Sequence, residues 1–88
     1  MAKKKDILSR MAENPRGDWR IEDIIKAAKH AELIVRPPSH GSHYTFASPY
    51  LERIETVPHK RPIKPIYVKR FCKFIDNHLS AKGAIKNG

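Results

Sequence analysis

Two histidines lie at places where the chain changes conformation. Gly41-Ser42-His43 leads into a segment that alternates polar and apolar residues, and His59 directly follows a valine and a proline. A free imidazole titrates near pH 6.5, at about the pH where an acid–base catalyst works best. Cleavage of RNA without a metal ion would need such a group, because a base activates the ribose 2′-hydroxyl and an acid protonates the leaving 5′-oxygen. These histidines are either catalysts of this kind or ordinary surface residues.

The charge balance favours a polyanionic partner. The 88 residues include 18 lysines and arginines against 9 aspartates and glutamates, which gives a formal net charge of +9. Such a surplus surrounds a small protein with a positive potential that attracts nucleic acid, an anionic membrane or an acidic protein. The cations near the second histidine and in the last expected helix either contact an RNA backbone or form a solvated surface. They are Lys60, Arg61, Lys64, Lys69, Arg70 and Lys73.

The composition argues against several classes of protein. No apolar run approaches the roughly 20 residues that a membrane-spanning helix needs. The basic start of the chain is not followed by the apolar stretch of a secretory signal. Cys72 is the only cysteine, so neither an internal disulfide nor a multi-cysteine zinc site can form, and we expect a reducing, cytoplasmic environment. Cys72 is expected to fill the core.

The spacing of apolar residues predicts three helices and three strands. Helices are expected at residues 5–13, 21–31 and 65–81, where apolar residues recur every three or four positions. Strands are expected at 33–35, 43–47 and 53–57, which are short and rich in β-branched or aromatic residues. Asp18 is the expected N-cap of the second helix, and that helix ends without a glycine.

The order α-α-β-β-β-α predicts an α+β fold. Short connections between three strands favour an antiparallel sheet with the helices on one face. Because successive side chains of a strand point to opposite faces, Tyr44 and Phe46 would pack against the helices and His43 would stand on the open face. We expect an N-terminal helix and turn at 1–18, a main domain at 19–82 and a flexible tail at 83–88.

Three other residues are expected to play no part in chemistry. His30 and His78 fall in expected helices and are predicted to be solvated there. Trp19 stands between the first turn and the second helix, and it is expected to anchor the core or a hinge.

The motifs together resemble the HicA toxins of bacterial toxin–antitoxin pairs. The similarity rests on Gly41-Ser42-His43 with its strand, on Ile54-Glu55-Thr56-Val57-Pro58-His59, and on Pro65 at the start of the last helix. It covers residues 19–75. The segment from 14 to 21 is similar to the family members that carry an extra N-terminal helix.

The resemblance implies a double-stranded-RNA-binding-like fold and a small ribonuclease that cleaves mRNA without a metal or another cofactor. It places the catalytic histidine at His43 and the histidine that follows Val-Pro at His59, which is an accessory candidate. His40 departs from the family pattern and is a second accessory candidate. It also implies a HicB-type antitoxin that covers the active site. The residues themselves leave two alternatives open: a non-catalytic RNA-binding module of the same fold, and an interaction protein that docks an acidic partner. A metal site at the three histidines is disfavoured, because no carboxylate or cysteine accompanies them.

Overall fold

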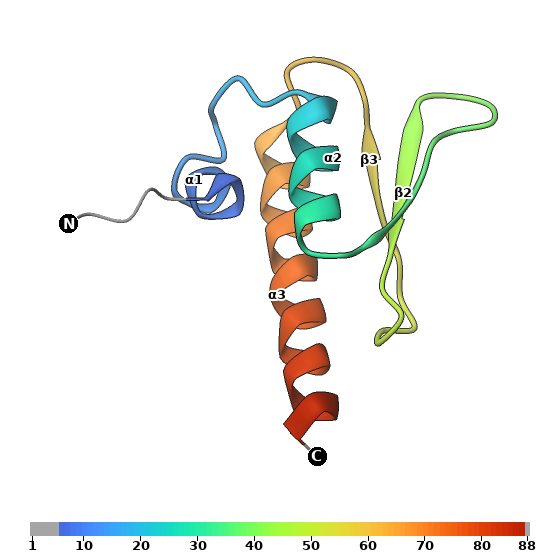
Figure 1. Cartoon of the computed structure of the whole chain (residues 1–88). Helices are drawn as coiled ribbons and strands as arrows, with labels where there is room; N and C mark the ends of the chain where they lie inside the picture. The colour runs from blue at the N-terminus through green and yellow to red at the C-terminus, as the bar shows by residue number, and fades with distance from the viewer. Residues whose placement is uncertain (1–5, 88) are drawn as a thin grey trace.

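The computed structural model describes residues 6–87 as three helices and one sheet (Figure 1). The elements are α1 (Ile7–Glu13), α2 (Ile21–His30), β1 (Ile34–Arg36), β2 (His43–Ala47), β3 (Glu55–Pro58) and α3 (Pro65–Asn87). The predicted α+β class and the order of elements are confirmed. Residues 1–5 of the predicted N-terminal segment and residue 88 of the predicted tail lie outside the described residues.

The sheet is antiparallel and its strands follow the order β1-β2-β3. All three helices lie on one side of it, with α2 and α3 between the sheet and α1 (Figure 1). Strand β2 has the predicted bounds. Strand β3 begins at Glu55, later than predicted, and extends to Pro58, which pairs with His43 at the start of β2. Proline is tolerated at this position because the end of an edge strand does not require its missing N–H.

The core forms between the helix-facing side of the sheet and the helices α2 and α3. Phe46 and Val57 are fully buried, and the ring of Phe46 meets that of Phe71 edge to face with 5.1 Å between centroids. Ile7 and Met11 add α1 to the same cluster. The predicted inward direction of Phe46 is confirmed, and Cys72 is buried in the core as expected.

Helix α2 begins and ends with local hydrogen bonds that differ from the prediction. The backbone N–H of Arg20 donates to Asp23 Oδ2 at 3.0 Å, so the expected N-cap at Asp18 is wrong. At the other end Glu32 takes the left-handed conformation, with φ at 66°. The N–H of Leu33 donates to Ala28 O and that of Glu32 to Lys29 O, which is the Schellman arrangement with glutamate in the position that glycine usually occupies. Strand β1 therefore starts at Ile34 and not at residue 33.

Helix α3 is longer than predicted. It passes the expected end at Ala81 and continues to Asn87, so its last turns extend beyond the sheet at the bottom of Figure 1. Lys82 pairs with Glu32 at the end of α2, which holds this part of the helix against the body. The local sequence of α3 could not show this pairing with Glu32, so it predicted too early an end for the helix.

The position of His78 differs from the prediction. It was predicted to be solvated, but its side chain is fully buried between three elements. Nδ1 lies 2.7 Å from Ser48 Oγ and Nε2 lies 2.7 Å from the carbonyl oxygen of Ala31. A buried polar ring is tolerated when its polar atoms have such partners. His30 is exposed as expected.

Candidate active site

His43 is the first residue of β2, and its side chain is exposed. Because Phe46 is buried against the helices, the alternation of β2 turns Tyr44 toward the helices and His43 toward the open face. Gly41, two residues earlier, has a φ of 80°, a conformation that glycine adopts without strain. Gly41 and Ser42 therefore form the turn that ends the β1–β2 connection, and His43 directly follows them as the first residue of β2.

A hollow of about 250 Å³ opens beside His43. The β1–β2 connection contributes Ser42 to its wall and strand β2 contributes His43, and the connection from β3 to α3 contributes two lysines. Tyr67 closes it from the first turn of α3. The residues that line this His43 hollow include Ser42, His43, Pro58, Lys60, Lys64 and Tyr67. One histidine and two lysines thus line the same space, and these are residue types that bind phosphate groups.

Backbone hydrogen bonds fix the wall of the hollow. The N–H of His59 donates to Ser42 O at 2.9 Å, which joins the turn before β2 to the end of β3. The N–H of Ile63 donates to Trp19 O at 2.8 Å, and Ile63 is buried. Trp19 is half buried, and its Nε1 donates to Asn14 O. The indole packs against the core cluster, as expected for a core anchor. The backbone carbonyl of Trp19 also holds the connection that carries Lys60 and Lys64.

The other two histidine candidates do not line the His43 hollow. The ring of His59 packs edge-on against Tyr44, with 6.4 Å between centroids. The His59 ring therefore lies beside Tyr44 and not in the hollow. His40 is exposed in the connection between β1 and β2. The structure therefore brings His43 together with lysines and a tyrosine, and not with a second histidine.

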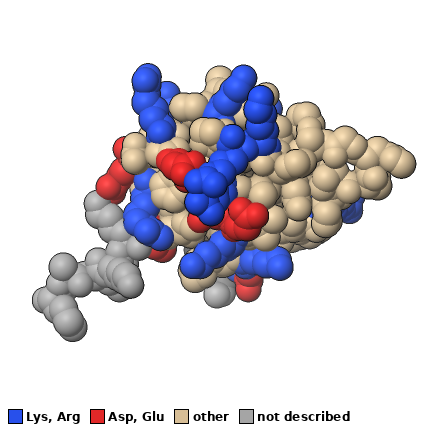
Figure 2. All heavy atoms as spheres, turned by 90° about the horizontal axis from the view of Figure 1, so that it is seen from above, with Lys and Arg blue, Asp and Glu red and all other residues tan. Residues whose placement is uncertain are grey.

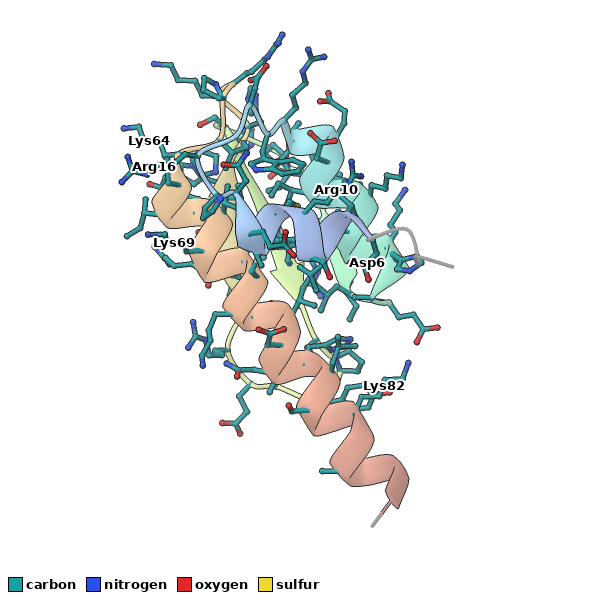
Figure 3. The ribbon with its side chains drawn as sticks, turned by 90° about the vertical axis from the view of Figure 1, so that its left-hand side faces the viewer. Asp6, Arg10, Arg16, Lys64, Lys69 and Lys82 are labelled. Carbon is teal, nitrogen blue, oxygen red and sulfur yellow. The ribbon has the colours of Figure 1, made fainter. Side chains whose placement is uncertain are left out.

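The six candidate cations fall into two groups. Lys60 and Lys64 line the hollow, and Lys69 and Lys73 are exposed on α3. Figure 3 shows Lys64 and Lys69 on one side of the molecule, with Arg16, which the sequence did not single out, on the same side in that view. The two arginines, Arg61 and Arg70, have acidic partners.

Arg61 forms a surface ion pair with Asp18. Its Nη2 lies 2.9 Å from Asp18 Oδ2 and its Nε lies 3.4 Å from Oδ1. The hydrogen bond and charge of Arg61 lower the pKa of Asp18, and Asp18 in turn raises the pKa of Arg61. Asp18, expected to cap α2, is thus used to hold the connection that follows β3.

Arg70 reaches a buried acid that the sequence did not reveal. Glu55, at the start of β3, is only 1% exposed. Arg70 Nη2 lies 2.8 Å from Glu55 Oε2, although it is not aligned for a hydrogen bond, and Arg53 Nη2 lies 3.4 Å from Oε1. The guanidinium of Arg70 also lies over the ring of Tyr67, 5.9 Å from the centroid. Arg70 therefore connects the core acid to the wall of the hollow.

The charged surface is not confined to one stripe. Seen from above, Lys and Arg side chains project at several places around the end that carries the β3–α3 connection, with Asp and Glu between some of them (Figure 2). The connection at 37–42 contains no Lys, Arg, Asp or Glu. The lysines of the His43 hollow are thus one part of a broadly basic surface.

Two further features concern metals and membranes. Within residues 6–87 no cluster of three or more His, Cys, Asp or Glu side chains is arranged to hold a metal ion. None of the helices in that range combines the length and the apolar character that crossing a bilayer would require.

Comparison with known proteins adds no further assignment. No protein-family model, no curated protein and no solved structure matches the chain. The resemblance to HicA toxins therefore stays a prediction that rests on the motifs of the sequence.

Proposed function

We propose that this protein is an endoribonuclease toxin of the HicA type, with His43 as a proton-transfer group in the cleavage of mRNA. The observation that carries the proposal is the His43 hollow, in which an exposed imidazole shares a wall with Lys60 and Lys64. The order α2-β1-β2-β3-α3 is also the order of a double-stranded-RNA-binding-like fold, and we include that fold in the proposal.

The proposed reaction needs no resident cofactor. His43 takes the proton of a ribose 2′-hydroxyl, and the oxygen attacks the adjacent phosphorus. The bond from phosphorus to the 5′-oxygen then breaks, which leaves a 2′,3′-cyclic phosphate and a 5′-hydroxyl. Lys60 and Lys64 stabilise the negative charge that builds up on the phosphate oxygens. In this reading Ser42 and Gly41 shape the turn that presents the imidazole.

The rest of the basic surface would hold the RNA strand. Lys69 and Lys73 are exposed on α3 and free to approach phosphates on either side of the scissile bond. Arg61 and Arg70 would act differently, because Asp18 and Glu55 already partner them. They would position the connection and the hollow more than they bind RNA.

The proposal includes an antitoxin of the HicB type as partner. A protein that covered the open end of β2 and β3 would exclude RNA from His43, and acidic side chains on it would complement the net charge of +9. Both proteins would act in the cytoplasm, where mRNA is found and where the single thiol at Cys72 stays reduced.

The test is cleavage of a defined mRNA by the purified protein in EDTA. We expect fragments with 2′,3′-cyclic phosphate ends from the wild type and none from His43→Ala, at unchanged circular dichroism. His30→Ala, which alters an exposed histidine on α2, is the matched control and should cleave normally. Undiminished cleavage by His43→Ala would refute the role of His43. RNA that is retarded in a gel but stays intact would identify the non-catalytic binding module instead.

A further inference from the structure

We infer that Tyr67 is the second proton-transfer group of the His43 hollow and protonates the leaving 5′-oxygen. This inference rests on the proposed ribonuclease function and names the group that the sequence left open. Tyr67 lines the same hollow as His43 from the opposite element, the first turn of α3. His59, an accessory candidate from the sequence, lies outside the hollow against Tyr44.

The lining of the hollow narrows the choice of an acid. Phenols and ammonium groups both keep their protons near neutral pH, so Lys60, Lys64 and Tyr67 are the groups that could donate one. The two lysines are exposed, whereas Tyr67 is half buried. A lysine that gave up its proton would also lose its positive charge at the moment when the phosphate needs it most. The positive charge is kept if both lysines stay protonated and bind the phosphate. Tyr67 then donates the proton.

The surroundings of Tyr67 favour that role. The guanidinium of Arg70 lies over its ring, 5.9 Å from the centroid. When a phenol donates its proton, negative charge spreads into the ring, and a cation above the ring stabilises it. The same guanidinium occupies one face of the ring, which reduces the room for a nucleobase to stack there.

Arg70 is in turn held in place by Glu55. The carboxylate is buried, and its Oε2 lies 2.8 Å from Arg70 Nη2. Arg53, in the connection between β2 and β3, lies near the other carboxylate oxygen, Oε1. Because strand β3 fixes Glu55, the side chain of Arg70 is tied to the sheet and not only to its own helix. Arg70 is therefore a positioning residue for the tyrosine.

The complete step balances as an exchange of two protons. The 2′-hydroxyl gives its proton to His43, and the new bond forms between the 2′-oxygen and phosphorus. The bond between phosphorus and the 5′-oxygen breaks, and that oxygen takes the proton of Tyr67. Transfer of the proton from the imidazolium through solvent to the phenolate restores both groups for the next cycle.

The inference is tested with Tyr67→Phe and two substrates. The variant keeps the ring under Arg70 and removes only the hydroxyl group. One substrate is an RNA with a normal linkage, and the other carries sulfur in place of the bridging 5′-oxygen at a single cleavage site. A thiolate leaves without protonation, so it does not need the acid. We expect Tyr67→Phe to cleave the normal RNA on the order of a hundredfold more slowly, with unchanged RNA affinity, and to cleave the sulfur-containing RNA at nearly the wild-type rate.

The controls separate this inference from the proposed function. His43→Ala should be impaired on both substrates, because the base is needed whichever group leaves. Arg70→Lys should show a smaller defect than Tyr67→Phe, confined to the normal RNA. A Tyr67→Phe variant that cleaves normal RNA within threefold of wild type would overturn the inference, and so would a defect that persists on the sulfur-containing RNA. In both cases an active wild type with an inactive His43→Ala would leave the ribonuclease function intact, whereas an inactive wild type would overturn both.

Discussion

Ser48 Oγ lies 2.7 Å from Nδ1 of His78, although the two residues are 30 positions apart in the chain and both are buried. The other ring nitrogen, Nε2, lies 2.7 Å from the carbonyl oxygen of Ala31. A carbonyl only accepts, so Nε2 carries the hydrogen, and in the neutral ring Nδ1 accepts from the serine hydroxyl. One imidazole thus joins the end of α2, the end of β2 and the middle of α3.

Removal of the His78 ring should destabilise the fold by more than the loss of its packing alone, because two hydrogen bonds are lost with it. His78→Leu keeps most of the volume but leaves Ser48 and the carbonyl of Ala31 without their partner, so we expect a loss of about 2–3 kcal/mol in the free energy of unfolding. Ser48→Ala should cost about 1 kcal/mol. The double variant should cost about 1 kcal/mol less than the sum, because the hydrogen bond is lost only once. Urea unfolding followed by circular dichroism measures all three, and strict additivity would contradict the coupling. His30→Leu, on the exposed side of α2, is the control and should change little.

The pair formed by Glu55 and Arg70 allows a second prediction about stability. Glu55 is buried, whereas the Arg70 side chain is about half exposed. Arg70→Met would leave a buried carboxylate with only the more distant Arg53, and we expect a loss of roughly 1–3 kcal/mol, reduced by water that reaches the exposed side. The double variant with Glu55→Gln should recover part of that loss, since an amide tolerates burial better than an unpaired charge. Thermal unfolding of the four proteins measures the effect.

Arg53→Met provides the matched control for that experiment. Its guanidinium is farther from the carboxylate, at 3.4 Å, and its side chain is more exposed than that of Arg70. Arg53→Met should lower the free energy of unfolding by less than about 1 kcal/mol. If Arg53→Met and Arg70→Met lowered the free energy of unfolding equally, Arg70 would not be the main partner of Glu55.

The alternation of β2 made the exposed position of His43 predictable, but it could not reveal the partners of buried polar residues. In α3 the apolar stripe correctly indicated Phe71, Phe74 and Ile75 as core. His78 continues the same stripe, but its polarity suggested an exposed position. Its hydrogen-bond partners directly follow α2 and β2, so the local sequence of α3 could not show them. Glu55 was hidden for the same reason. Partners that are distant in the chain decide whether a polar side chain is buried.

The site was predictable only in part for a related reason. Gly41-Ser42-His43 is a local motif, and the glycine conformation that it requires is present, with φ at 80°. The hollow beside it combines residues from β2, the β3–α3 connection and α3. Tyr67 follows Pro65 in the last helix, where the local sequence indicates only a helix start, and the packing of α3 beside the end of the sheet brings it to His43. The local sequence left His59 as an accessory candidate because it could not show that this ring would pack against Tyr44 and outside the hollow.

The thiol of Cys72 should be almost inert in the folded protein. Burial, and to a smaller extent the charge of Asp76, raises the pKa of Cys72 from 9.0 to about 11. At pH 8 the thiolate fraction is then roughly a hundredfold lower than for an ordinary thiol of pKa 9. Alkylation by iodoacetamide should be slower than that of the urea-unfolded chain by at least this factor, and it should accelerate about tenfold per pH unit. Rapid alkylation of the native protein at pH 8 would contradict the buried position.

The same pKa predicts how stability changes in alkali. Above pH 9 the unfolded chain loses the thiol proton, whereas the folded protein keeps it up to about pH 11. The unfolded state therefore binds fewer protons in this window, and the free energy of unfolding should fall as the pH rises from 9 to 11. Other groups titrate there too, so the measured quantity is the difference between wild type and Cys72→Ala. If that difference stayed constant between pH 8 and pH 11, the raised pKa would be wrong.

RNA binding should depend on Lys60 and Lys64 more than on the exposed lysines of α2. Each phosphate contact with single-stranded RNA contributes about 0.7 to the slope of log affinity against log salt concentration. The variant Lys60→Gln/Lys64→Gln should therefore lower that slope by about 1.4, measured by fluorescence anisotropy with labelled RNA in the His43→Ala background to prevent cleavage. Lys26→Gln/Lys29→Gln removes the same charge from exposed positions on α2 and should leave the slope nearly unchanged. Equal losses from the two double variants would mean that net charge alone attracts RNA, and that the lysines of the His43 hollow make no contact of their own.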